Sequence, residues 1–110
     1  MITVSVFQDS EGGGYTGIEL AGHAGYAEHG EDIICAAVSA LVLNMANSVE
    51  QFTGDPFEGG TEEATGHFWF RFTGTVSSES TLLMNSLILG IRNIQREYGK
   101  QYIKIRIKEV

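Results

Sequence analysis

The stretch "DIICAAVSALVLNMANSVEQF", residues 32–52, decides the fold because a helix start signal precedes a long apolar pattern. Asp32 suits the N-cap position, where a carboxylate accepts hydrogen bonds from the first free N–H groups of a helix. Apolar residues then recur every three or four positions, and these are Ile34, Val38, Leu41, Val42, Met45, Val49 and Phe52. Gly54 and Pro56 are typical of a helix end. We therefore predict a helix that is apolar on most sides and lies either in the centre of the domain or in a subunit interface.

Strands are predicted on both sides of this helix. Before it, "MITVSVFQ" (1–8) alternates apolar and polar residues, and a glycine-rich turn leads into "YTGIELAGHA" (15–24), which together indicate a hairpin. After it, "PFEGGTEEA" (56–64) and "GHFWFRFTG" (66–74) form a second predicted hairpin. Phe68, Phe70 and Phe72 share one face of that hairpin. The last segment, "YIKIRIKEV" (102–110), has the clearest strand alternation in the chain.

A second amphipathic helix is predicted over residues 77–99. Ser77 or Ser78 suits its cap, and Gly99 suits its end. Its expected apolar stripe consists of Leu83, Leu87, Ile91, Ile94 and Tyr98. The element order is then strand, strand, helix, strand, strand, helix, strand. This order predicts an α+β fold in two layers, a mostly antiparallel sheet packed against two helices, as a single domain over residues 1–110.

Composition narrows the class of protein. With 43% hydrophobic and 19% charged residues in 110 positions, the chain has an ordinary globular composition. The single cysteine cannot form an internal disulfide, so we expect a reduced thiol and a cytoplasmic protein. No basic leader with an apolar core opens the sequence. The apolar stretch from 33 to 45 is interrupted by polar residues, and we predict that it is too short and too polar to span a membrane.

The formal net charge of −7 bears on possible partners. A protein that binds nucleic acid through phosphates needs a local surplus of Lys and Arg, so we expect no direct nucleic-acid partner. A negative charge favours association with a basic partner. It also serves solubility alone, and the sequence leaves both interpretations open.

The single cysteine, Cys35, falls at the third position of the predicted helix if Asp32 is the cap. Backbone N–H groups and the positive end of the helix dipole favour a thiolate in the first turn. A thiolate is the reactive form of a cysteine nucleophile. The same N–H groups can hold the oxyanion of a tetrahedral intermediate.

A base for this thiol is available in His23, at the predicted end of the second strand. The glycines between His23 and Cys35 would let the connection fold back and bring the two residues together. Asp32 has two open roles, since it either only caps the helix or also orients the imidazole. Ser39 lies one helical turn beyond Cys35 on the same face.

Other interpretations of these residues remain open. A lone cysteine on an apolar helix is often a small buried hydrophobe. His23, His29, Cys35 and Asp32 are ligand types that zinc accepts, although their spacing matches no usual ligand pair, so we predict no metal. His67 is expected to pair across the second hairpin.

The segment "GHAGYAEHGEDIICAAVSAL", residues 22–41, resembles the signature of the bacterial ribosomal-processing cysteine protease family, also called the Prp family. The likeness consists of a Gly-His pair at a strand end, a glycine-containing loop, and Gly30, Asp32, Cys35, Ala36 and Ser39 leading into an apolar helix. It extends over essentially the whole chain in length and element order.

The resemblance implies a Cys-His protease in which His23 and Cys35 are catalytic and Gly22, Asp32 and Ser39 surround the site. It also implies a homodimer. Peptide-bond hydrolysis by a Cys-His pair needs no cofactor, so we expect none. The implied substrate is the short N-terminal extension of large-subunit ribosomal protein twenty-seven. Two rival functions remain at this point: a non-catalytic accessory domain that binds a basic ribosomal partner, and a thiol-based redox or metal-sensing module.

Overall fold

The computed structural model describes residues 1–22 and 33–110, which form five strands, two helices and one short 3-10 turn. The elements are β1 (Ile2–Gln8), β2 (Tyr15–Ala21), α1 (Ile33–Phe52), β3 (Phe57–Glu62), η1 (Glu63–Thr65), β4 (His67–Phe72), α2 (Ser78–Tyr98) and β5 (Ile103–Glu109). The predicted element order is confirmed over these residues. The second strand ends at Ala21, three residues earlier than predicted.

The strands form one sheet in the order β3-β4-β2-β1-β5. Three neighbouring pairs are antiparallel, while β1 and β5 run parallel. The predicted α+β class with a mostly antiparallel sheet is therefore confirmed, with the parallel pair at one edge. This topology places the second hairpin at the opposite edge, next to the end of β2.

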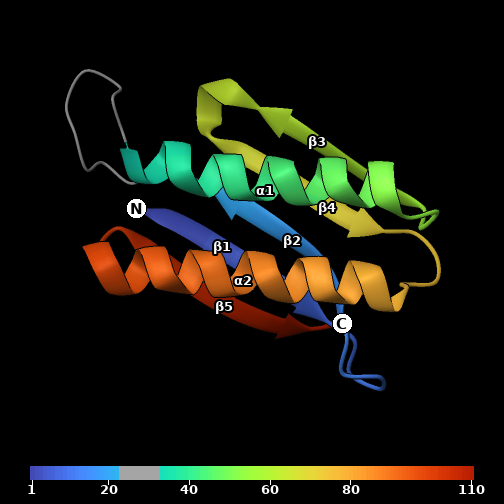
Figure 1. Cartoon of the computed structure of the whole chain (residues 1–110). Coiled ribbons are helices and arrows are strands. Elements are labelled where there is room, and N and C mark those ends of the chain that lie inside the picture. The colour runs from blue at the N-terminus through green and yellow to red at the C-terminus, as the bar shows by residue number, and fades with distance from the viewer. Residues whose placement is uncertain (23–32) are drawn as a thin grey trace.

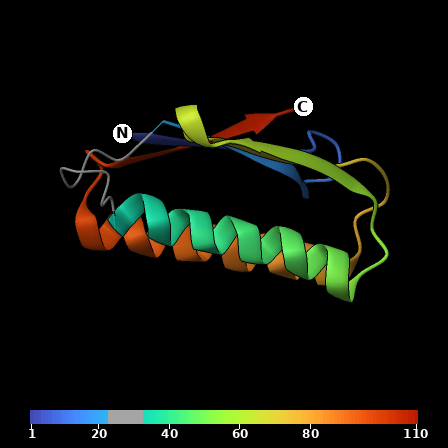
Figure 2. The same ribbon diagram turned by 90° about the horizontal axis from the view of Figure 1, so that it is seen from above.

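Both helices cover the same face of the sheet, and they run antiparallel to each other (Figures 1 and 2). The core lies between the two layers. Its buried side chains from the sheet are Ile2, Val4, Val6, Ile18, Leu20, Phe68, Phe70, Phe72 and Ile103. The predicted common face of the three phenylalanines is thus confirmed, since all three point into the core. Burial of each such side chain contributes roughly 1.5–3 kcal/mol to the free energy of folding.

The helices bury narrower faces than their apolar patterns predict. In α1 the buried residues are Ile34, Val38, Val42, Met45 and Val49, whereas Phe52, the last residue of the predicted apolar pattern, is 75% exposed. In α2 the buried residues are Ser80, Met84, Leu87, Ile88 and Ile91. Tyr98 was also wrongly placed in the buried stripe, because it lies in the last turn and is 39% exposed. A helix against one sheet buries only the stripe that faces it, so apolar residues outside that stripe stay exposed.

The prediction that this apolar stretch is too short and too polar to cross a membrane was wrong. α1 continues to Phe52, and by length and composition alone it is long and apolar enough to cross a membrane. Core helices pass the same test. Five of its residues are buried in the core.

The start of α2 is held by a carboxylate from a distant loop. Ser77 caps the helix by accepting a hydrogen bond from the Ser80 backbone N–H. Asp55, in the connection between α1 and β3, accepts bonds from the Ser77 hydroxyl at 2.6 Å and from the Ser77 N–H at 2.8 Å. The side-chain bond from Ser77 is the largest cause that lowers the pKa of Asp55 below its ordinary value of 3.8. The ionised carboxylate of Asp55 therefore links the α1–β3 connection to the N-terminus of α2.

Replacing Asp55 by Asn is expected to destabilise the protein in a pH-dependent manner. Because the pKa of Asp55 is lowered in the folded state, its contribution is present above pH 3.8 and disappears as the pH falls through the folded value. The melting temperature of wild type should therefore exceed that of Asp55→Asn at pH 7, and the difference should shrink below pH 4. Thermal unfolding followed by circular dichroism at several pH values measures this, and a difference that stays constant down to pH 2.5 would contradict it.

Candidate active site

Cys35 is the third residue of α1, so the prediction that the thiol lies in the first helical turn is confirmed. Its side chain is half-buried and packs against the edge of the hydrophobic core. The preceding residue, Ile34, is fully buried and fixes the rotation of the helix at this point. A step of one residue turns the helix by about 100°, which places Cys35 at the margin of the core rather than within it.

Ser39 lies one turn further along the same flank of α1, and both side chains line one pocket with a volume of about 400 Å³. α1 contributes four residues to this pocket, Cys35, Ser39, Val42 and Leu43, whose spacing of i, i+4, i+7 and i+8 places them on one side of the helix. The residues that line the pocket are Leu20, Cys35, Ser39, Val42, Leu43, Thr61, Glu62, Gly66, His67 and Phe68. Its opposite wall thus comes from the tip of the β3–β4 hairpin. The structure therefore brings two of the five predicted site residues, Cys35 and Ser39, to one cavity.

His67, the first residue of β4, is a member of this pocket that the sequence analysis did not assign to the site. Its Nε2 atom lies 3.3 Å from Oε2 of Glu19 on β2. The expectation that it pairs across its own hairpin was therefore wrong for the side chain, although the backbone register places it opposite Glu62 on β3. No local pattern indicates that His67 lines this pocket, because the pocket forms between α1 and the hairpin tip, which are far apart in the sequence.

Gly22 follows the last residue of β2 and has a backbone φ of +86°, in the region that favours glycine. A Cβ atom at this position would lie 2.6 Å from the carbonyl oxygen of Met1. The chain can therefore leave β2 in this direction only without a side chain at residue 22. This gives a physical reason for the glycine that precedes His23.

The remaining predicted site residues, His23 and Asp32, lie outside the described residues, as does His29. Within residues 1–22 and 33–110, no group of three His, Cys, Asp or Glu side chains is arranged to hold a metal ion. Most of the candidate zinc ligands lie outside that part, so the prediction of no metal stays untested.

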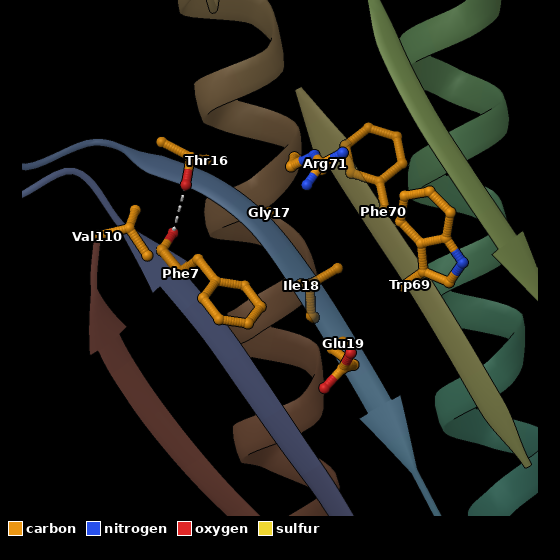
Figure 3. A pocket seen from close by; sticks show the side chains of 9 residues that line it. All are labelled: Phe7, Thr16, Gly17, Ile18, Glu19, Trp69, Phe70, Arg71 and Val110. Carbon is orange, nitrogen blue, oxygen red and sulfur yellow. Dashed lines mark hydrogen bonds between the residues drawn. The ribbon is translucent and has the colours of Figure 1, made fainter. Parts of the chain in front are cut away.

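A second hollow of about 410 Å³ lies on the sheet face that the helices leave uncovered. Figure 3 shows Phe7, Glu19, Trp69 and Arg71 around this hollow. Gly17 lies on β2, the strand between β1 and β4. The guanidinium of Arg71 is already engaged, because it pairs with Glu58 and lies 5.8 Å from the centre of the Trp69 ring. Glu19, which lines this hollow, contacts His67 between β2 and β4.

The Cys35 pocket combines features that suit covalent chemistry on a peptide. The thiol stands where the first-turn N–H groups of α1 can stabilise negative charge. Apolar side chains form much of the wall, and the pocket opens to solvent beside polar groups at the hairpin tip. A cleft that combines apolar walls with a small number of placed polar groups is the usual form of a ligand site.

Comparisons with known proteins agree with this arrangement. The sequence model of the family described as cysteine protease Prp matches residues 1–104. The ribosomal processing cysteine protease Prp of Bacillus subtilis is 34% identical over 90 residues, covering 77% of this chain and 80% of the relative. That of Staphylococcus aureus is 30% identical over 100 residues, covering 91% and 93%. A crystal structure of the S. aureus protease with a covalently linked product peptide superposes with a TM-score of 0.89 at 30% identity, covering 98% of this chain and 100% of that chain.

Substitution of Gly22 by Ala should destabilise the exit from β2. The backbone would have to move away from the Met1 carbonyl or leave the positive-φ region, at a cost of about 1–3 kcal/mol. Chemical denaturation of Gly22→Ala beside Gly14→Ala measures this cost. Gly14 is a matched control because a Cβ there meets nothing within 4 Å. Equal stability of the two variants would contradict the explanation.

Proposed function

Because the chain belongs to the cysteine protease Prp family, we propose that it removes the short N-terminal extension of large-subunit ribosomal protein twenty-seven, using Cys35 and His23 as a catalytic dyad. The observation that carries the proposal is the place of Cys35, in the first turn of α1 and at a pocket large enough for a peptide side chain. The sequence likeness to proteases named for ribosomal processing supports the substrate class.

The reaction begins with transfer of the Cys35 proton to His23. The thiolate then attacks the carbonyl carbon of the scissile peptide bond, and an S–C bond forms while the carbonyl oxygen becomes an oxyanion. First-turn N–H groups of α1 are placed to donate hydrogen bonds to that oxyanion. As the C–N bond breaks, His23 gives its proton to the leaving amine.

The second half of the reaction releases the acyl-enzyme. A water molecule gives a proton to His23 and adds to the thioester carbonyl, and Cys35 leaves as the thiolate while the peptide leaves as a carboxylic acid. In this scheme Asp32 supports the dyad, either by capping α1 or by orienting the imidazole of His23. Ser39 faces the same pocket as the thiol and is positioned to contact the bound peptide. No step requires a cofactor.

The proposal includes a homodimer in the cytoplasm, with neither nucleic acid nor membrane as a direct partner. Exposed apolar side chains on the helix layer support self-association, since Leu43 is 46%, Leu82 69% and Leu89 59% exposed. α1 also carries a single charged residue, Glu50, along its 20 residues. An uncharged helix surface of this kind is more typical of an interface than of a solvated face.

Cleavage of the extended ribosomal protein, read by intact mass, tests the proposed function. We expect one cut near the N-terminus by wild type and a loss of at least about a thousandfold in rate for both Cys35→Ala and His23→Ala. His67→Ala is the comparison variant, because His67 lines the same pocket. It should lower the rate by no more than about tenfold, since the base is assigned to His23.

The outcomes of this assay separate the rival functions. No cleavage by folded wild type would favour an accessory domain that binds a basic partner. Cleavage that survives in His23→Ala but not in His67→Ala would transfer the role of base to His67. Cleavage that survives in Cys35→Ala would reject the cysteine protease mechanism.

A further inference from the structure

A smaller hollow adjoins the Cys35 pocket on the helix side of the sheet. Its volume is about 220 Å³, and it lies between Ala46 of α1 and residues of β3 and β4. Thr61 and Phe68 line both this hollow and the Cys35 pocket, so the two are continuous. We call the combined depression the α1–β3 groove. Its α1 side consists of Cys35, Ser39, Val42, Leu43 and Ala46.

β3 forms the other side of the groove with its helix-facing residues. Phe57, Gly59 and Thr61 lie opposite three phenylalanines of β4 that are buried in the core, and cross-strand partners point to the same face of a sheet. Gly59 leaves the middle of this side open, and a Cβ atom there would lie 2.7 Å from the carbonyl oxygen of Trp69. Figure 1 shows β3 as the outermost strand, beyond α1, so the groove lies along an edge of the sheet.

The backbone of β3 offers hydrogen-bonding groups at this edge. The N–H of Thr73 donates to the carbonyl of Pro56 at 2.9 Å, which sets the phase of the ladder between β3 and β4. In an antiparallel ladder only every second residue bonds to the neighbouring strand. The even-numbered residues of β3 therefore bond to β4, and the N–H and C=O groups of the odd-numbered residues point away from it. Within residues 1–22 and 33–110, no strand pairs with β3 on that side.

The residues that face the free edge are thus the same residues that line the groove. An extended chain placed beside β3 would bond to their backbones and direct every second side chain toward α1. Ala46 follows Cys35 by eleven positions, which is about 16 Å along a helix. An extended peptide covers that length with about five residues. The groove therefore matches a short extended segment that ends at the thiol.

We propose that the peptide cleaved at Cys35 binds as an added strand on the free edge of β3, with alternate side chains in the α1–β3 groove. The inference rests on the proposed protease function and assigns recognition of the substrate main chain to Phe57, Gly59 and Thr61. In strand addition the main-chain hydrogen bonds supply affinity, and pockets for alternate side chains supply specificity. The recognition of the peptide should therefore repeat every two residues.

Single N-methyl groups on the peptide backbone test this period. Peptides that span the cleavage site of the extended ribosomal protein are N-methylated at one amide in turn, two to five residues from the cleaved bond on either side. On one side of the bond we expect kcat/KM of wild type to fall about tenfold or more at every second residue and less than about threefold at the residues between. Only alternate N–H groups of an added strand face its neighbour, and N-methylation removes the donor. Losses without this alternation overturn the inference, while cleavage of the unmodified peptide upholds the protease function.

A pair of variants tests the same contact from the side of the protein. Thr61→Pro removes an N–H that faces the free edge and leaves the bonds to β4 in place, whereas Thr61→Ala keeps that N–H. We expect kcat/KM for the unmodified peptide to be about tenfold lower in Thr61→Pro than in Thr61→Ala. Equal values in the two folded variants, as judged by circular dichroism, contradict the inference. If Thr61→Pro does not fold, the N-methylated peptides on wild type decide.

Failure of the protease function is separable from failure of this inference. If wild type cleaves no unmodified peptide, the protease proposal fails. Strand addition is then measured by fluorescence anisotropy of the same labelled peptides with Cys35→Ala, in which β3 is unchanged. Either no binding of the unmodified peptide, or binding that N-methylation weakens without alternation, overturns strand addition as well.

Discussion

The packing of one face of α1 against the sheet is the constraint on which the site depends. Ile34 is 0% exposed and Val38 is 1% exposed. Truncation of such a residue to Ala lowers the free energy of unfolding by about 2–5 kcal/mol for Ile and somewhat less for Val. That burial fixes the rotation of the helix. Cys35 and Ser39, each one residue further along, are thereby held at the margin of the core, where a thiol keeps its packing on one side and reaches a pocket on the other.

The second wall of the pocket depends on sheet topology rather than on local sequence. The order β3-β4-β2-β1-β5 places the tip of the second hairpin beside the end of β2. The hairpin thus contributes residues to a cavity that Cys35 and Ser39 line from the first helix.

The sequence predicted the parts of this account that local physics determines. Alternating strands, the Ser77 cap and the Gly99 end of α2 depend on neighbours in the chain, and the structure confirms them. Phe52 and Tyr98 belong to the predicted apolar patterns but are exposed, because periodicity does not show where the covering layer ends. The contact between Glu19 and His67 was missed for a similar reason, since these residues are 48 positions apart and meet only through the pairing of β2 with β4. The dyad of His23 and Cys35 stays a prediction that rests on chemistry and on the family likeness.

The rate at which iodoacetamide modifies Cys35 in the folded protein at pH 7 tests the central claim most directly. Intact mass reports the modification at a single site, because the chain has one cysteine. The account predicts rapid modification of wild type and a markedly slower reaction in His23→Ala, since an adjacent base and the start of the helix together favour the thiolate. Equal rates in both proteins, or modification of wild type only after unfolding, would contradict the assignment of Cys35 as an activated nucleophile.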